Sequence, residues 1–366
     1  MARMTSSDPF TNTERRASIE GPFQGEELAL AHRNSGMLLE ALRHDVTPAG
    51  MHYLLIHFDV PYVADGKWQL EVTGRVKNRL SLSLDGIKRL PGRSVRVTLE
   101  CAGNGRALMS PRFPSMPWRH EAVGTADWTG TPLRHVLEQA GIAGDAVDVV
   151  FIGADHGFDR GVEQDYARSL QREAALSDDV LLVWEMNGQQ LLPQHGYPLR
   201  LVVPGWYGMA SVKWLKRIEV LDKPFDGFQQ VRTYMYRASA DDTPTPVSRL
   251  RVKSLLVPPG IPDWFTRRRL VEAGPTPLFG RAWSGNVPIA RVEVGVDGAW
   301  HEAELDPPMG EFAWRGWRFT WDATPGEHEL SCRATNAEGE TQPLQPRFDM
   351  GGFGNNAVQR VQVKVR

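Results

Sequence analysis

A single cysteine at the end of a predicted strand is the residue of this chain best suited to chemistry. Apolar side chains alternate through Val95–Leu99, which predicts a strand whose inward face continues to Cys101. The glycine-containing segment Ala102–Arg106 then turns the chain, so the thiol lies beside open backbone amides and an arginine. Such surroundings lower the pKa of a thiol or present it to a metal as a soft ligand. The alternative is a small apolar side chain that completes a core strand, which is the commoner role of a lone cysteine.

Basic side chains beside glycine-rich turns form a second group of candidates. His195 and Arg200 precede a predicted buried strand, and Ser211 and Lys213 follow the turn at Pro204–Gly208. Cationic groups next to free turn amides suit an anion such as a phosphate. A solvated rim around a core strand explains the same pattern, so the residues alone leave both interpretations open.

Three further residues are ambiguous when they are taken alone. His57 lies in the apolar run Met51–Asp59, where a hydrogen-bonded core histidine is the default. Asp155 follows the end of a predicted strand, a position typical of site residues and also of turns. Cys332 alternates with apolar residues in a later strand pattern, which indicates a core residue. The sequence contains no Walker loop, G-x-S-x-G elbow, H-E-x-x-H segment or paired C-x-x-C, which excludes the zinc-protease, zinc-ribbon and covalent c-type haem classes among others.

The elements that carry these residues change character along the chain. Residues 1–45 are polar and irregular, with one helical pattern at Glu26–Leu42, and we expect them to form an arm on the body. The next part of the chain combines a helix with strands. The helix is predicted at Thr131–Gly141, with Thr131 as its N-cap and Pro132 in its first turn. Strand patterns occur at Trp68–Val76, Val147–Ile152, Val180–Met186 and Leu199–Val203.

The last third of the chain lacks helical patterns. Regularly spaced short strands over roughly 100 residues are typical of a β-sandwich. These patterns lie at Arg291–Val296, Trp317–Trp321, Glu329–Ala334 and Val361–Val365. We therefore predict the α+β class, with an arm at 1–45, a mixed α/β domain at 46–238 and an all-β domain at 239–366.

The composition limits the classes of partner and location. The 366 residues include 42 Lys and Arg against 44 Asp and Glu, and no basic block is interleaved with aromatic residues, so no nucleic-acid partner is expected. The longest apolar runs fall far short of the roughly 18 residues that a membrane span needs, so no membrane association is expected. Two cysteines cannot form a disulfide framework, and the first residues lack the apolar region of an export signal. These observations favour a cytoplasmic protein.

Several short segments, in this order and spacing, resemble the sulfite oxidase family of molybdenum enzymes. In the predicted α/β domain they are Glu100–Arg106, Asp127–Leu133, Glu185–Gly188, His195–Arg200, Pro204–Gly205 and Val212–Leu215. In the all-β domain, Gly280–Gly285 and Gly354–Ala357 are similar to the family's C-terminal dimerisation domain. The resemblance covers the chain from about residue 50 to its end. It implies a mixed α/β molybdopterin-binding domain followed by an immunoglobulin-like sandwich that pairs two subunits into a homodimer.

The resemblance also implies roles for individual residues. Cys101 would be the thiolate ligand of molybdenum, and Tyr234 the active-site tyrosine, with Tyr236 as the alternative. Arg106 would be a basic residue of the substrate pocket. One molybdopterin per chain would be held by Tyr53, His57, Asp155, His195, Arg200, Ser211, Val212 and Lys213. The subunit interface or the sandwich core would contain Trp283, Trp300, Trp317 and Trp321.

The implied reaction is oxygen-atom transfer to or from a small anionic or oxo substrate, by default the oxidation of sulfite to sulfate. No haem domain is expected, so the electrons would pass to a separate acceptor. Leu55 and Gly351 stand where the family pattern has arginines, and Arg112, Arg160 and Arg232 are candidates to compensate for the missing charge. The alternatives are an S-oxide, N-oxide or nitrate reductase on the same cofactor, and a non-catalytic binding protein on a degenerate scaffold.

Overall fold

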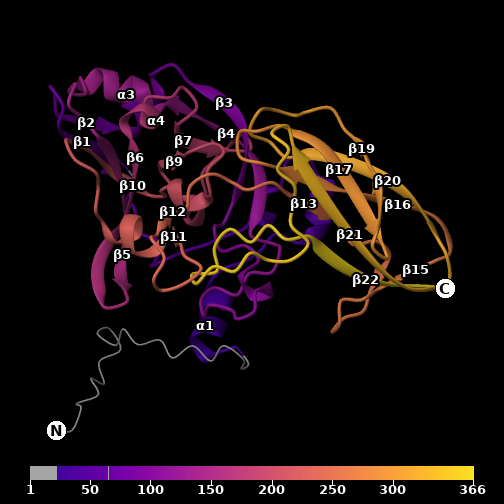
Figure 1. Ribbon diagram of the computed structural model, residues 1–366. Coiled ribbons are helices and arrows are strands. Elements are labelled where there is room, and N and C mark those ends of the chain that lie inside the picture. The colour runs from indigo at the N-terminus through magenta and orange to yellow at the C-terminus, as the bar shows by residue number, and fades with distance from the viewer. Residues whose placement is uncertain (1–22, 65) are drawn as a thin grey trace, which may run out of the picture.

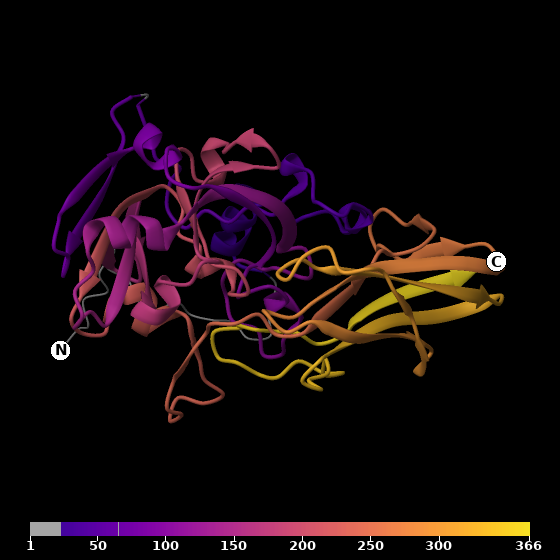
Figure 2. The ribbon, with the colours of Figure 1, turned by 90° about the horizontal axis from the view of Figure 1, so that it is seen from above.

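The computed structural model describes residues 23–64 and 66–366, which form two regions that lie side by side (Figures 1 and 2). The part of the expected arm at 1–22 lies outside the described residues. The first region combines helices with two sheets, and the second consists of strands and loops. The predicted α+β class with a following all-β region is therefore confirmed, while the boundary at residue 238 stays a prediction.

Two five-stranded sheets build the first region. The first sheet has the order β2-β1-β10-β5-β6, in which β1 and β10 are parallel and the other neighbours antiparallel. Its strands are β1 (Gln69–Gly74), β2 (Leu80–Ser83), β5 (Asp148–Asp159), β6 (Val162–Gln171) and β10 (Leu215–Leu221). The second sheet has the order β3-β4-β7-β8, with β9 beside β7. Its strands are β3 (Arg93–Glu100), β4 (Val123–Pro132), β7 (Leu181–Met186), β8 (Gln189–Gln190) and β9 (Arg200–Val202).

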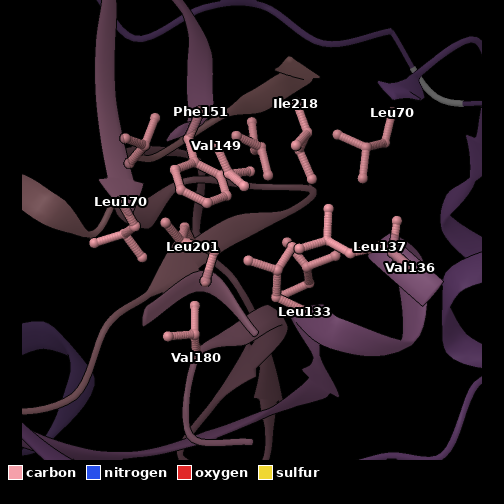
Figure 3. Packing of buried hydrophobic residues seen from close by; sticks show 14 of the residues in the cluster. Leu70, Leu133, Val136, Leu137, Val149, Phe151, Leu170, Val180, Leu201 and Ile218 are labelled. Atoms are coloured by element: carbon pink, nitrogen blue, oxygen red, sulfur yellow. The ribbon is translucent and has the colours of Figure 1, made fainter. Parts of the chain in front are cut away.

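The core of the first region lies between these sheets and helix α3 (Leu133–Ala140) (Figure 3). Leu133, Val136 and Leu137 share one face of α3 because they are three or four residues apart, and all three are fully buried. They pack in one cluster with Phe151 of β5 and with apolar side chains of the other strands. The short helices α2 (Leu84–Lys88) and α4 (Arg172–Ala175) complete this region.

The start of α3 differs from the prediction. Thr131 belongs to β4, and its hydroxyl donates to the carbonyl of Pro91 at 2.8 Å, so it does not cap the helix. Pro132 occupies the N-cap instead. Gly141 ends the helix as expected, with a φ of 68° that favours glycine over other residues.

The predicted single helix at Glu26–Leu42 is wrong. The chain forms α1 (Gly25–Arg33) and, after a break, the 3-10 turn η1 (Leu39–Arg43). The break begins at Asn34, whose side chain accepts a hydrogen bond from the amide of Ile56 at 2.6 Å and donates to the carbonyl of Leu30 at 2.9 Å. These bonds join the arm to the segment before β1 and compete with continuation of the helix.

The second region is a sandwich of a four-stranded and a six-stranded sheet. The first sheet, β13-β16-β20-β19, consists of β13 (Lys253–Leu256), β16 (Gly274–Trp283), β19 (Glu304–Leu305) and β20 (Arg315–Ala323). The second, β14-β15-β22-β21-β17-β18, consists of β14 (Ile261–Pro262), β15 (Arg269–Val271), β17 (Ile289–Val296), β18 (Ala299–Glu302), β21 (Gly326–Asn336) and β22 (Gln359–Val365). A small hairpin of β11 (Met235–Tyr236) and β12 (Thr245–Pro246) precedes it. The β-sandwich is confirmed, and its immunoglobulin-like character stays a prediction.

Most of the sandwich tryptophans pack inside the chain. Trp317 and Trp321 belong to the sandwich core, and Trp283 is buried between the two regions. Trp300 is half-buried beneath the guanidinium of Arg333, which lies 4.2 Å from its ring centre. The three buried tryptophans are therefore not available to a subunit interface.

The two regions are joined by a shared apolar cluster and by a long loop. The cluster combines Leu42 of the arm, Val123 of β4, and Trp283 and Trp314 of the sandwich. Segment 337–358, between β21 and β22, extends from the sandwich to the first region near β11 and β12 (Figure 1). Because of this loop, sandwich residues reach the turn that follows β3. Across residues 23–64 and 66–366, no helix is long and apolar enough to span a bilayer.

Candidate active site

A cavity with about 640 Å³ of empty space is lined by residues of both sheets in the first region and of the loops beside them. Asp155 lies inside β5, at an irregularity in its pairing with β6, and does not follow the end of the strand as expected. The predicted site residues that line the cavity are Tyr53, His57, Cys101, Asp155, His195, Arg200, Ser211, Lys213 and Tyr234. Arg106 and Val212 are not among its lining residues. The Val212 side chain packs in the core of the first region. Residues spread over 182 positions of sequence, from 53 to 234, thus meet at one cavity.

Cys101 is the first residue after β3, so the sheet fixes the direction of its side chain. Its amide donates to the carbonyl of Ala122 at 2.9 Å, and its carbonyl accepts from the amide of Asn104 at 2.9 Å. Burial raises the pKa of the Cys101 thiol, and the charge of nearby Arg106 only partly offsets that effect. The expected lowering of the thiol pKa is therefore wrong. Of the two expected roles, that of a metal ligand fits better, because a bound metal ion deprotonates a coordinating thiol outright.

Two buried cations form one end of the cavity. Arg200, the first residue of β9, donates to the carbonyls of His195 at 3.0 Å and Ser211 at 3.2 Å. Lys213 Nζ donates to the carbonyl of Leu55 at 2.7 Å and to a second backbone carbonyl at 3.2 Å. These contacts position both side chains, but the bonded carbonyls are neutral, and the Asp155 carboxylate at the same cavity only partly offsets the Lys213 charge.

The pKa values at this end show the cost of that poorly compensated charge. Burial lowers the pKa of Arg200 to about 10. Burial and the neighbouring Arg200 charge lower the pKa of Lys213 well below its usual range. Burial also lowers the pKa of His195 to about 3, aided by the charges of His52, Arg200 and Lys213. An anion among these groups would stabilise their charged forms, as a phosphate does.

Two buried polar atoms at the cavity have no hydrogen-bond partner among the residues that the structure describes. They are His52 Nε2 and Asp155 Oδ1, and both residues line the cavity. Burial lowers the pKa of His52 to about 4 and raises that of Asp155. Since buried polar atoms in native proteins are nearly always paired, these atoms indicate a polar group that the chain itself does not supply.

A second group of side chains lines the cavity around Tyr234, which is bonded to a histidine, and we call it the Tyr234 end. The Tyr234 hydroxyl oxygen is 2.7 Å from His57 Nε2. The imidazole of His57 stacks on the ring of Tyr166 with centroids 4.5 Å apart, and Tyr166 donates to the carbonyl of Met209 at 2.8 Å. Burial lowers the pKa of His57 to about 3, so its ring is neutral, and with the proton on Nε2 it donates to the Tyr234 oxygen and leaves the Tyr234 proton free for another acceptor. The stack thus orients the Tyr234 hydroxyl.

Tyr236, the alternative tyrosine, faces another hollow. This depression has about 830 Å³ of empty space and is lined by Tyr236, Arg251 and Arg347 among others. The guanidinium of Arg251 lies 4.3 Å from the Tyr236 ring centre. Tyr234 lines the cavity that contains Cys101 and Tyr236 does not, which favours Tyr234 as the site tyrosine.

Of the two positions that lack the family's arginines, one lies at the cavity with its carbonyl bonded to Lys213, and the other lies beside Arg106. Leu55 lines the cavity directly. Gly351 lies beside Arg106, since its carbonyl accepts a hydrogen bond from Arg106 Nε at 3.1 Å. Arg106 Nη1 also donates to the carbonyl of Met116 at 3.2 Å, and its guanidinium lies 5.2 Å from the Phe353 ring centre. Arg106 is thus held in place by backbone carbonyls.

None of the three arginines expected to compensate lines the cavity. Arg112 forms an ion pair with Glu27 of α1. Arg160 lies in the turn between β5 and β6, and Arg232 is exposed. Arg168 of β6 is the buried arginine near Tyr234, with its guanidinium 5.4 Å from the tyrosine ring centre. The predicted compensation by Arg112, Arg160 or Arg232 is therefore wrong.

Three site residues were missed because their sequence signals are ordinary. Tyr166 and Arg168 alternate with apolar Leu170 along β6, so a period of two already places the arginine on an inward face. A charged side chain on the inward face of a strand indicates a buried functional site, because charged residues are rarely buried without a partner. His52 lies five residues before His57 in the same apolar run, which indicates a core histidine and does not distinguish a cofactor contact.

The chain matches two family models that together span most of its length. Residues 57–229 match the oxidoreductase molybdopterin binding domain, and residues 246–366 match the Mo-co oxidoreductase dimerisation domain. The mitochondrial sulfite oxidase of Mus musculus is 33% identical over 386 aligned positions, which cover 98% of this chain and 67% of that protein. The chain belongs to the sulfite oxidase family of molybdopterin-dependent oxidoreductases.

Other relatives show how wide this family is. An NADH nitrate reductase of Brassica napus is 30% identical over 91% of this chain, and the match spans only 42% of that longer protein. The crystal structure of the sulfane dehydrogenase SoxCD from Paracoccus pantotrophus superposes with a TM-score of 0.78 at 25% identity, covering 96% of this chain and 92% of that one. Proteins similar to this chain therefore include enzymes named for different substrates.

Membership of the sulfite oxidase family makes molybdopterin the cofactor, and the cavity residues fit it. The unpaired atoms of His52 and Asp155 supply polar contacts for a pterin ring. The poorly compensated charges of Arg200 and Lys213 suit its phosphate. Cys101, which lines the same cavity, offers the soft sulfur ligand that molybdenum chemistry uses.

Proposed function

We propose that this chain is a sulfite-oxidising molybdenum enzyme in which Cys101 is the thiolate ligand of the metal. The observation that supports it best is one cavity containing Cys101, a buried cationic end at Arg200 and Lys213, and the hydrogen-bonded pair of Tyr234 and His57. The bound molybdenum cofactor supplies oxygen-atom transfer coupled to two-electron redox change. The net reaction converts sulfite and water into sulfate, two protons and two electrons.

The residues of the chain divide the remaining tasks. Arg200, Lys213, His195 and Ser211 bind the phosphate end of the cofactor, with the backbone of Val212 between them. Tyr53, His52 and Asp155 contact the pterin, and His57 acts chiefly through its bond to Tyr234. The Tyr234 hydroxyl donates to an oxygen of the substrate, and Arg106 supplies positive charge at that end. Each group is buried or lines the cavity, where low solvent access strengthens such contacts.

A second candidate is the reverse reaction, the reduction of an S-oxide, an N-oxide or nitrate. The observation in its favour is the reduced positive charge, since Leu55 and Gly351 replace two expected arginines. A sulfite dianion loses about 1.5–3 kcal/mol for each missing charge-assisted bond, whereas a neutral oxide loses much less. The nitrate reductase relatives show that the family's named activities include reduction.

The proposed assembly is a homodimer through the sandwich, with electrons passing to a separate acceptor. The match of residues 246–366 to the Mo-co oxidoreductase dimerisation domain supports the dimer. The β14–β15 hairpin adds exposed apolar surface, because Trp264 is 79% and Phe265 is 87% exposed. A cytoplasmic location stays a prediction that cell fractionation tests.

Turnover of the purified holoenzyme tests this proposal. We expect about one molybdenum and one pterin per chain, and sulfite-dependent reduction of an artificial acceptor such as ferricyanide. We expect Cys101→Ser to abolish turnover while the fold is retained, with Cys332→Ser as the matched control that stays active. Turnover only with nitrate or a sulfoxide plus reduced viologen would make the reductase the better assignment. Absence of molybdenum and pterin from protein made in a cofactor-competent host would favour a non-catalytic binding protein.

A further inference from the structure

The carboxylate next to Cys101 is bonded to the sandwich and not to its own region alone. Glu100 ends β3 and is 1% exposed. Its Oε1 accepts from Lys253 Nζ at 2.8 Å and from Asn104 Nδ2 at 2.9 Å. Its Oε2 accepts from Trp283 Nε1 at 2.8 Å. Two of these three donors come from the sandwich, so the residue before the thiol is held by both regions.

The two sandwich donors form a single structural unit. Lys253 of β13 and Trp283 of β16 lie directly opposite each other in the antiparallel ladder, so their side chains share one face of the sheet. Both side chains are at most 2% exposed, and Lys253 Nζ makes a further bond to the carbonyl of Asn355 at 3.0 Å. A cross-strand pair on a rigid sheet presents its two donors to both oxygens of one carboxylate.

The far side of the same turn is also held by the sandwich. We define the Cys101 loop as residues 101–105. Asn355 Nδ2 donates to the carbonyl of Gly105 at 2.8 Å, and the amide of Gly354 donates to the carbonyl of Ala102 at 2.8 Å. Gly105 has a φ of 90°, and a Cβ there would lie 2.8 Å from Asn355 Nδ2, so this close approach requires glycine. Residues on both sides of the thiol are therefore bonded to the second region.

Stability alone does not account for this arrangement. A buried ion pair loses the hydration of both charges, and an apolar pair of similar volume is often equally stabilising or better. Specific geometry is what a buried, fully bonded ion pair adds. Here the Cys101 thiol, one residue from Glu100, needs a fixed direction, because a metal ligand held about 1 Å out of place loses much of its function.

We propose that Lys253 and Trp283 are positioning residues of the active site, which set the direction of the Cys101 sulfur through Glu100. The sandwich then has a role in each single chain, independent of pairing two chains. This inference rests on the proposed role of Cys101 as the metal ligand. It also explains why the similarity to the family extends to Gly280–Gly285 and Gly354–Ala357, since both segments contain residues that contact the Cys101 loop or Glu100.

The test compares purified holoenzymes by the electron paramagnetic resonance spectrum of partially reduced molybdenum, by metal content and by kinetics. Trp283→Phe removes one donor and keeps the ring, and the double variant Glu100→Gln with Lys253→Met replaces the ion pair without leaving an unpaired charge. The matched control is Arg281→Met, which removes the interregion bonds of Arg281 to Asp45 and to the carbonyl of Leu42, away from the Cys101 loop. Melting temperatures of all variants are measured so that loss of stability is compared directly.

We expect shifted or broadened molybdenum spectra in both test variants, with kcat reduced roughly tenfold and KM little changed. The control is expected to keep the wild-type spectrum at a similar loss of melting temperature. Wild-type spectra and kcat in Trp283→Phe and in any folded double variant would overturn the inference. The proposed role of Cys101 fails separately, if Cys101→Ser itself keeps the wild-type spectrum.

Discussion

The two ends of the cavity differ in the polar groups that they present. At the cofactor end, Arg200 and Lys213 bond to neutral carbonyls, and burial lowers the pKa of both. At the Tyr234 end, Tyr234 bonds to His57, and buried Arg168 donates to a backbone carbonyl while its Nε has no partner among the described residues. Both ends therefore favour an anion, and the Tyr234 end adds a hydroxyl that His57 orients.

Cofactor binding and substrate turnover should therefore depend on different ends of the cavity. The cofactor end retains every basic residue that the family resemblance implies, so we expect this chain to bind the cofactor as other members of the family do. The Tyr234 end keeps its tyrosine and Arg106, whereas Leu55 and Gly351 stand where arginines are expected. Changes at one end should therefore alter turnover or substrate affinity, and changes at the other should alter cofactor content.

The largest effect is expected from Tyr234→Phe. Loss of a hydrogen-bond donor aimed at developing charge reduces kcat by about 100-fold in comparable sites. Pterin and molybdenum content should not change, because the Tyr234 hydroxyl bonds to His57 and not to Arg200 or Lys213. Tyr236→Phe is the matched control, since Tyr236 faces the other hollow, and it should retain near-wild-type kcat. The opposite order of effects would show that Tyr236 is the active-site tyrosine.

The next largest effect is expected from Lys213→Met, with opposite signs for binding and stability. Loss of a charge-assisted bond to phosphate should weaken cofactor retention by about 10- to 100-fold, equivalent to roughly 1.5–3 kcal/mol. The same change removes a buried charge that Arg200 repels, so the cofactor-free protein should melt at a higher temperature.

Fluorescence of the released pterin and thermal melting measure the two effects of Lys213→Met. Lys216→Met is the control, because Lys216 is partly exposed and pairs with Asp165 on the surface. It should change neither quantity appreciably. A Lys213→Met protein with full pterin content would show that this lysine does not hold the phosphate.

The strands that position the site could be predicted because alternation and apolar runs are local features of the sequence. Alternation placed the end of β3 at Cys101, and burial of the strands around Asp155 and Arg200 followed from their apolar runs. The single helix at Glu26–Leu42 failed because Asn34 bonds to Ile56, a contact 22 residues away that no local pattern contains. The prediction that Thr131 caps α3 was wrong because its hydroxyl donates to the carbonyl of Pro91, just before β3.

The chemistry of the site was less predictable than its location. His195, Arg200 and Lys213 fit a solvated rim as well as an anion site, because sequence does not reveal burial. The family resemblance decided between these interpretations. It could not identify Arg168, whose position behind Tyr234 depends on the packing of β6 against the segment that follows β10.

A smaller effect is expected from Leu55→Arg, which returns a charge to the cavity. One new charge-assisted bond should lower the KM for sulfite by about tenfold, with pterin content unchanged. Gly351→Arg is less informative, since a Cβ at Gly351 would lie 2.5 Å from the Phe353 ring. Leu55→Met is the control for side-chain shape. An unchanged KM for sulfite in Leu55→Arg, with intact turnover, would favour a neutral oxide as the substrate.

The smallest effect concerns the pH dependence of the cofactor-free protein. The pKa of His195 is about 3 in the folded state and near 6.5 when unfolded, so between these values the unfolded chain binds one more proton. The free energy of unfolding therefore falls as the pH drops below 6.5. His195→Gln removes this term, and its loss of stability from pH 7 to pH 5 should be smaller than that of the wild type by about 1–2 kcal/mol.

Urea unfolding at pH 7 and pH 5 measures the His195 effect, and His328 provides a control of opposite sign. The hydrogen bond to Asp297 raises the pKa of His328, so its contribution is present at low pH and lost as the pH rises through the folded-state pKa. His328→Gln should therefore lose more stability than the wild type from pH 7 to pH 5, and His195→Gln less. Equal pH dependence in His195→Gln and the wild type would mean that His195 is already charged in the empty site, which would contradict the poorly compensated positive charge inferred for that end.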